Sequence, residues 1–197
     1  MFTCIIGGFL GTGKTTLLMK IAGRCRLSGV KVAILVNEMG EVGIDGATIK
    51  AEGYDAVELP DGCICCSLSG TLQNALKSIE RDIHPDIIII EPTGLALPHK
   101  VKELVRTSLI DSDRTYIAGL ADAVRFDDLM EKKGEFFKRQ LHASDIILIT
   151  KSDMSDKEDL KRISDLLKMM HPGRDVIFVS SVTGEGIDET ARRILNG

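Results

Sequence analysis

The chain contains no tryptophan, and aromatic residues make up only 4% of its 197 residues. Without large rings the core has to be aliphatic, which is typical of α/β proteins. No apolar run approaches the roughly 20 residues that a membrane-spanning helix requires, so we expect no membrane partner. The net charge is −4 and no run of basic residues stands out, which argues against nucleic acid as a main partner.

A disulfide framework is also missing. The chain has five cysteines, an odd number, and three of them fall within Cys63-Ile64-Cys65-Cys66. We therefore expect a reducing, cytoplasmic environment in which the thiols serve metal or redox chemistry. A strand-like run starts at Phe2 and leaves no room for a signal peptide. With no repeat or linker, the length fits a single domain over residues 1–197.

Strand-like and helix-like patterns alternate along the chain. Unbroken aliphatic runs such as Ile87-Ile88-Ile89-Ile90 predict strands buried on both faces of a parallel sheet. The expected strands are 2–6, 31–36, 86–90, 115–121, 145–149 and 176–179. The expected helices are 15–27, 68–81, 99–109, 135–142, 157–170 and 187–195. The alternation predicts a doubly wound, mainly parallel α/β sheet with helices on both faces and ligands at the carboxyl ends of its strands. Residues 37–67 are expected to form a long functional loop.

The segment between the first strand and the first helix matches a phosphate-binding loop. Residues Gly8 to Thr15 have the pattern G-x-x-x-x-G-K-T. Its glycines allow backbone N–H groups to turn toward phosphates, and the helix N-terminus adds partial positive charge. We expect Lys14 to reach the β- and γ-phosphates and Thr15 to bind Mg²⁺. The expected nucleotide contacts here are Gly8, Gly11, Thr12, Gly13, Lys14, Thr15 and Thr16.

Two later segments predict guanine as the base. Thr150-Lys151-Ser152-Asp153 follows an expected strand and has the form [N/T]-K-x-D. The Asp153 carboxylate can accept hydrogen bonds from guanine N1–H and the 2-amino group, whereas adenine would leave it unpaired. The Lys151 stem is expected to pack along the base. The turn that begins with Ser180 and Ser181 can offer backbone N–H groups to the guanine oxygen.

Two acidic segments predict switch loops. Glu91-Pro92-Thr93-Gly94 ends the most apolar strand, where Glu91 can hold Mg²⁺ through a water and the Gly94 N–H can bond the γ-phosphate. Such a contact exists only with triphosphate bound, so this loop is expected to switch. After the second strand, either Glu38 or Asp45 can orient the attacking water, and the sequence does not decide between them.

The three clustered thiols predict a transition-metal site. Thiolates of Cys63, Cys65 and Cys66 suit Zn²⁺, Co²⁺, Ni²⁺ or Cu(I). Three sulfurs leave a tetrahedral ion one ligand short, which suits an ion that arrives and leaves rather than a closed structural site. Glu38, a histidine, water or a partner's thiol can supply the fourth ligand. A redox pair is the alternative interpretation.

Taken together, these motifs resemble those of the CobW-like GTPases, which belong to the same metallochaperone class as UreG, HypB and MeaB. The segments that carry the resemblance are Gly7 to Thr16, Asn37-Glu38-Met39-Gly40-Glu41, Gly62-Cys63-Ile64-Cys65-Cys66, Glu91-Pro92-Thr93-Gly94, Ala121-Asp122-Ala123 and Thr150-Lys151-Ser152-Asp153. The resemblance implies a P-loop GTPase that couples GTP hydrolysis to delivery of a transition metal or metallocofactor to a client protein. It also implies a nucleotide-dependent homodimer.

Family members usually carry a further C-terminal domain, and we expect none within these 197 residues. The leading hypothesis is a Mg²⁺-dependent GTPase with slow intrinsic turnover, in which nucleotide state changes the metal affinity of the cysteines. One alternative is a MeaB-like chaperone that gates a cobalamin or other metallocofactor enzyme. Another is a zinc storage module that makes no use of nucleotide.

Overall fold

The computed structural model describes residues 1–37, 49, 53–59 and 69–196. Its sheet has seven strands in the order β3-β2-β4-β1-β5-β6-β7, and every neighbouring pair is parallel. The strands are β1 (Phe2–Gly7), β2 (Val32–Asn37), β3 (Asp55–Leu59), β4 (Ile87–Glu91), β5 (Thr115–Asp122), β6 (Ile146–Thr150) and β7 (Asp175–Val179). The helices in the described residues are α1 (Lys14–Leu27), α3 (Ser69–Ile83), α4 (Pro98–Thr107), α5 (Phe126–Leu141), α6 (Lys157–Met170) and α7 (Ile187–Asn196). The expected doubly wound parallel sheet is confirmed.

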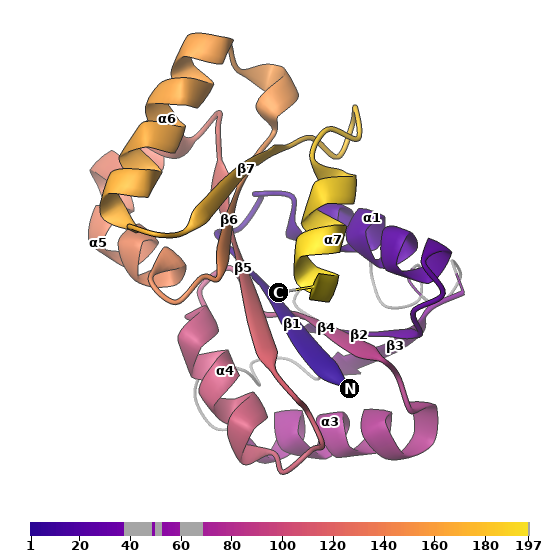
Figure 1. The fold of residues 1–197 in the computed structure, drawn as a ribbon. Coiled ribbons are helices and arrows are strands. Elements are labelled where there is room, and N and C mark those ends of the chain that lie inside the picture. Colours follow the sequence, from indigo (N-terminus) through magenta and orange to yellow (C-terminus); the bar gives the residue numbers. More distant parts are fainter. Residues whose placement is uncertain (38–48, 50–52, 60–68, 197) are drawn as a thin grey trace.

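Helices lie on both faces of the sheet (Figure 1), and aliphatic side chains fill the space between them and the strands. Successive side chains of a strand point to opposite faces, so Cys4 and Ile6 pack on one face and Ile5 on the other. Helices α1 and α7 cover the first face. Helices α3 and α4 cover the second face toward β2 and β4, and α5 and α6 cover it toward β6. Both faces of the central strands are therefore buried, as their unbroken aliphatic runs predict.

Two elements differ from the sequence-based expectation. Strand β3 lies inside the segment that was expected to be a loop, and among the described strands it pairs only with β2. Helix α5 starts at Phe126 rather than at residue 135. Non-helical angles at Lys133 (φ −139°, ψ 23°) kink this helix just before Gly134, so only its second half had been expected. The other expected elements agree with the structure to within two residues at each end.

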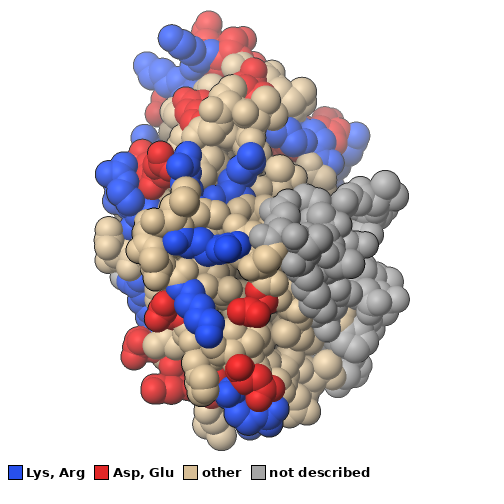
Figure 2. Space-filling model, turned by 90° about the vertical axis from the view of Figure 1, so that its right-hand side faces the viewer, with Lys and Arg blue, Asp and Glu red and all other residues tan. Residues whose placement is uncertain are grey.

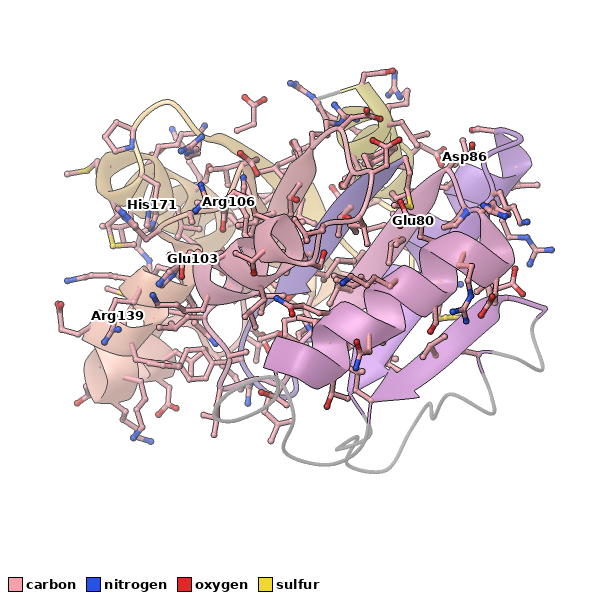
Figure 3. The ribbon with its side chains drawn as sticks, turned by 90° about the horizontal axis from the view of Figure 1, so that it is seen from below. Glu80, Asp86, Glu103, Arg106, Arg139 and His171 are labelled. Carbon is pink, nitrogen blue, oxygen red and sulfur yellow. The ribbon has the colours of Figure 1, made fainter. Side chains whose placement is uncertain are left out.

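Carboxylates organise the amino ends of the strands. Glu80 near the end of α3 accepts the Asp111 N–H (2.7 Å), and Asp86 accepts the Lys31 N–H (2.8 Å); Figure 3 labels both carboxylates. Asp145 accepts the Ile117 N–H at 2.7 Å. These bonds join loops at the amino ends of the strands.

Arg114 ties α7 to the first strand in the same region. Its Nη2 donates to the carbonyls of Ile194 (2.9 Å) and Leu195 (2.8 Å) at the end of α7. The guanidinium also lies 4.5 Å from the centre of the Phe2 ring. The two ends of the described chain therefore lie close together (Figure 1).

No helix among the described residues is long and apolar enough to cross a membrane. On the face drawn in Figure 2, Lys and Arg side chains alternate with Asp and Glu rather than gathering by sign.

Candidate nucleotide-binding site

The phosphate-binding loop occupies residues 8–13, between the end of β1 and the start of α1. Gly11 (φ 74°) and Gly13 (φ 83°) adopt the left-handed conformation that favours glycine. The Phe9 carbonyl accepts hydrogen bonds from the Thr12 hydroxyl (2.8 Å) and from Lys14 Nζ (3.2 Å). The loop is therefore closed on itself, with the Lys14 ammonium group bent back over it.

The remaining loop positions fit this geometry. Gly8 is buried, and a Cβ there would lie 2.9 Å from Leu120 Cβ and 3.1 Å from the Thr12 hydroxyl oxygen. Thr16 is exposed on the first turn of α1. The structure thus places the seven expected contacts on one loop and the helix turn that follows it.

A carboxylate from the neighbouring strand faces the start of α1. Glu91 ends β4, which pairs with β1, and its Oε1 accepts a 2.9 Å hydrogen bond from the Thr15 hydroxyl. Its Oε2 is buried and has no hydrogen-bond partner among the described residues. Because the hydroxyl oxygen of Thr15 keeps free lone pairs, these two side chains fit a hydrated divalent cation of the Mg²⁺ type.

Burial shifts the pKa values of both charged groups in this cluster. Burial raises the pKa of Glu91, and the opposing effects of Lys14 and the Thr15 hydrogen bond are smaller. Burial also lowers the pKa of Lys14; Glu91 opposes this shift, and Arg125 adds to it. In both cases burial disfavours the charged form. A bound phosphate would stabilise the Lys14 ammonium group, and a bound cation would stabilise the Glu91 carboxylate.

Gly94 packs directly on the phosphate loop. A Cβ at Gly94 would lie 2.5 Å from the Leu10 backbone nitrogen, so only glycine permits this approach. The Gly94 carbonyl accepts a 2.8 Å bond from Gln140 Nε2, which also donates to the Ala96 carbonyl at 3.2 Å. Gln140 of α5 is 2% exposed. Sequence reasoning missed it because no motif surrounds it.

The guanine-type segments lie side by side, since β6 pairs with β7. The Ser152 hydroxyl donates a 2.7 Å bond to Glu185 Oε2 and links the two segments. Asp153 is exposed and has no partner among the described residues, so its carboxylate is free to accept a ligand's donors.

Ser180 is fully buried, and its hydroxyl accepts the N–H groups of Val182 and Thr183, which shapes this turn. Ser181 is half-buried beside it. Lys151 links this segment to the phosphate loop, since its Nζ donates to the Gly11 carbonyl at 3.0 Å. The Thr150 hydroxyl donates to the Ala121 carbonyl at 3.5 Å.

Five expected site residues lie outside the described residues: Glu38, Asp45, Cys63, Cys65 and Cys66. The two described cysteines, Cys4 and Cys25, are buried free thiols. Within the described ranges, no group of three His, Cys, Asp or Glu side chains is arranged to hold a metal ion. The proposed metal site therefore depends on residues 60–68.

Strand register constrains where those residues start. Val36 of β2 pairs with Glu91 of β4, and Asn37 pairs with Leu59 of β3. Strands β2 and β3, after which the segments with Glu38 and Cys63 begin, therefore end level with Glu91 at the carboxyl ends of the strands.

A parallel sheet of this order, with a glycine-rich loop and a threonine that bonds a carboxylate of the adjacent strand, defines a P-loop nucleotide-binding protein. The chain also matches the family model "CobW/HypB/UreG, nucleotide-binding domain" over residues 2–178. It belongs to this family, which confirms the resemblance found in the sequence.

Curated relatives support the assignment. Zinc chaperone YeiR of Escherichia coli (strain K12) is 37% identical over 158 residues, covering 79% of this chain and 48% of the relative. Zinc chaperone CobW of Sinorhizobium sp is 32% identical over 191 residues, covering 82% and 53%. The chain spans about half the length of these relatives.

Solved structures show the same fold. Hydrogenase maturation factor HypB from Archaeoglobus fulgidus has a TM-score of 0.72 and 22% identity, covering 100% of this chain and 91% of that one. Zn(II)-bound YjiA GTPase from E. coli has a TM-score of 0.64 and 24% identity, covering 91% and 57%.

Proposed function

We propose that this chain is a Mg²⁺-dependent GTPase domain that couples its nucleotide state to the binding and delivery of a transition metal such as Zn²⁺, Co²⁺ or Ni²⁺. The observation that carries the GTPase part is the arrangement of Lys14, Thr15 and Glu91 at the start of α1, in which one buried Glu91 oxygen has no partner in the described part of the chain. The free carboxylate of Asp153 supports guanine as the base. The zinc chaperones among its relatives support the metal part.

In the proposed reaction the chain's own groups bind and orient GTP. Lys14 neutralises charge on the β- and γ-phosphates, and the Gly94 N–H contacts the γ-phosphate. Thr15 and Glu91 would hold Mg²⁺, which supplies neutralisation of the charge that develops on the transferred phosphoryl group. Glu38 or Asp45 would orient the attacking water. Loss of the γ-phosphate releases Gly94 and so changes the loop that follows Glu91.

The sheet supports a route from this loop to the cysteines. Residues 38 and 60 directly follow the paired residues Asn37 and Leu59. Asn37 ends the strand next to β4, and Leu59 ends the strand beyond it. A shift at the carboxyl end of β4 therefore reaches the starts of the segments that carry Glu38 and Cys63. We propose that GTP and GDP states differ in the geometry of the Cys63, Cys65 and Cys66 thiolates, and that metal in turn shifts nucleotide affinity by the same factor.

An apolar rim next to the phosphate loop supports a homodimer. Leu10, Leu95 and Val124 are 52%, 75% and 50% exposed. Leu10 lies against Gly94, and its carbonyl accepts a bond from Arg125, so all three belong to one rim. We propose that a second copy covers this rim when GTP is bound. Light scattering on the protein with a non-hydrolysable GTP analogue should give twice the mass found with GDP; equal masses would contradict the dimer.

Hydrolysis is tested with Lys14→Ala. We expect the rate of phosphate release from GTP to fall on the order of 100-fold, because the lysine charge is directed at the transferred group. Lys20→Ala, on the exposed side of α1, is the matched control and should retain the rate. A Lys14→Ala variant that hydrolyses GTP at the normal rate would refute the assignment.

Metal coupling is tested by titrating Zn²⁺, Co²⁺ and Ni²⁺ into the protein loaded with the GTP analogue or with GDP. We expect different affinities in the two states, and loss of the difference in Cys65→Ala/Cys66→Ala. Equal affinities would contradict the coupling. In that case a GTPase rate that responds to a client enzyme but not to metal would identify a cofactor-enzyme chaperone instead.

A further inference from the structure

A buried carboxylate connects the guanine-type segment to the phosphate loop. Asp122 ends β5 and is fully buried. Its Oδ2 lies 2.7 Å from Lys151 Nζ and 3.2 Å from Arg125 Nε. Its Oδ1 accepts the N–H groups of Val124 (3.1 Å) and Arg125 (3.4 Å). One carboxylate thus orients two cations that come from different elements.

Both cations donate onward to adjacent carbonyls of the phosphate loop. Lys151 Nζ donates to the Gly11 carbonyl at 3.0 Å, and Arg125 Nη2 donates to the Leu10 carbonyl. A peptide group is planar, so fixing the Leu10 oxygen also fixes the direction of the Gly11 N–H. Two carbonyls of the phosphate loop are therefore held by the Lys151 and Arg125 side chains, which Asp122 orients.

We propose that Asp122 is a positioning residue that couples recognition of the guanine base to binding of the phosphates. This inference rests on the proposed use of guanine nucleotides. Lys151 is expected along the base and Arg125 supports the phosphate loop, and both depend on the same carboxylate. If Asp122 is lost, the base site and the phosphate site lose their orientation together.

The substitution Asp122→Asn probes the charge with little change of shape. An amide has one acceptor oxygen and one NH₂ group, which only donates. If the oxygen serves the Val124 and Arg125 N–H groups, the NH₂ faces Lys151 Nζ and Arg125 Nε, donor against donor. The reversed orientation sets the NH₂ against the two backbone N–H groups. Neither arrangement restores the four contacts.

Arg125→Gln separates the two effects. The Arg125 side chain is 41% exposed, so its replacement disturbs little packing. The pair of Asp122 and Lys151 stays in place, whereas the donor to the Leu10 carbonyl is lost. This variant should weaken phosphate binding and leave base recognition unchanged.

The test measures dissociation constants of GDP, ADP and GMP. The ratio for GDP against ADP reports the base, and the ratio for GDP against GMP reports the β-phosphate. We expect Asp122→Asn to lower both preferences by about tenfold or more, as for loss of a hydrogen bond between charged groups. Arg125→Gln should lower only the β-phosphate preference, by about five- to tenfold. Asp127→Asn is the matched control: Asp127 is an exposed α5 carboxylate paired with Arg162, and its loss should change neither ratio.

A purely structural role for Asp122 gives a different result. Partial unfolding lowers the affinity for all three nucleotides by one factor and leaves both ratios unchanged, and that outcome would overturn the proposal. If Asp122→Asn does not fold, the test relies on Arg125→Gln. An unchanged ratio for GDP against GMP in that variant again overturns the proposal. A wild-type protein without preference for GDP over ADP would contradict the proposed function itself. A wild-type preference that survives in both variants would contradict only this inference.

Discussion

Thr15 and Glu91 lie 76 positions apart in the chain, yet the Thr15 hydroxyl donates a 2.9 Å hydrogen bond to Glu91 Oε1. The contact exists because β1 and β4 are neighbours in the sheet, which brings the start of α1 beside the end of β4. The second oxygen of Glu91 is buried and remains unused by the described residues. The two side chains are therefore arranged as the proposed Mg²⁺ site requires.

We expect Glu91→Gln to weaken the Mg²⁺ dependence of nucleotide binding and to slow GTP hydrolysis on the order of 100-fold, because an amide cannot neutralise the cation. Phosphate release measured across a Mg²⁺ titration checks this. Glu103→Gln is the matched control. Glu103, which Figure 3 labels, is an exposed α4 carboxylate paired with Lys100. Equal Mg²⁺ dependence in wild type and Glu91→Gln would refute the role of Glu91.

We expect Asp153→Asn to lower GDP affinity about 100-fold, since a carboxylate that accepts two hydrogen bonds is lost. Xanthine carries a carbonyl where guanine has its 2-amino group, so xanthosine diphosphate should bind the variant better than GDP does. Competition binding with both nucleotides measures this exchange. Asp165→Asn, an exposed carboxylate of α6, serves as the control. Undiminished GDP affinity in Asp153→Asn would place the base elsewhere.

We expect Gly94→Ala to reduce nucleotide affinity about tenfold or more and to destabilise the fold by about 1–3 kcal/mol. The added Cβ would lie 2.5 Å from the Leu10 nitrogen and 3.0 Å from its Cα, so backbone has to move. Gly70→Ala in α3 is the control, because nothing lies within 4 Å of a Cβ there. That change should be neutral, or stabilising by up to about 1 kcal/mol. Thermal melts and GDP titration of both variants test the expectation, and identical behaviour would contradict it.

We expect Cys4 and Cys25 to resist alkylation of the native protein at pH 8. Burial raises the pKa of the Cys25 thiol from 9.0 to about 11, and it also raises the pKa of Cys4. Because the thiolate is the reactive form, both should label only after unfolding. Mass spectrometry of peptides from native and urea-treated protein measures this, and equal labelling in the two samples would contradict the burial.

The same shift predicts a pH dependence of stability. The pKa of Cys25 is higher in the folded than in the unfolded protein, so the folded state holds the thiol proton more tightly. The stabilisation of the fold by the buried Cys25 thiol is therefore fully present below pH 9.0 and is lost as the pH rises toward about 11. Urea midpoints from pH 8 to 11 should therefore fall more steeply for wild type than for Cys25→Ala. Parallel curves would show that Cys25 does not contribute.

Local patterns were enough to predict most of the fold. The aliphatic runs and the glycine-rich loop depend on neighbours in the sequence, so six strands and the phosphate-binding loop could be placed from the sequence. Strand β3 could not, because the short segment Asp55–Leu59 is stabilised by pairing with β2 rather than by its own pattern. The first half of α5 was not predicted, because charged residues precede Gly134 and the helix is kinked at Lys133, which interrupts the helical pattern there.

The site residues divide in the same way. Lys14, Thr15, Glu91 and Asp153 sit in motifs, so the sequence alone predicts them as site residues. Asp122, Arg125 and Gln140 lie outside the predicted site, and their contacts form between strands and helices that become neighbours only on folding. Asp122 reaches the phosphate loop because β5 pairs with β1. The segment Ala121-Asp122-Ala123 carries part of the family resemblance, but the role proposed for Asp122 depends on contacts that the sequence does not show.

The bonds from Arg114 to the carbonyls of Ile194 and Leu195 have a practical consequence. They hold the last turn of α7 at the edge where the strands begin, whereas the phosphate loop lies at the edge where they end. An affinity tag, dye or surface linker joined after α7 would thus start near the amino ends of the strands, away from the phosphate loop. Immobilisation through that end leaves the phosphate loop accessible, so binding assays on a sensor surface can use the protein in this orientation.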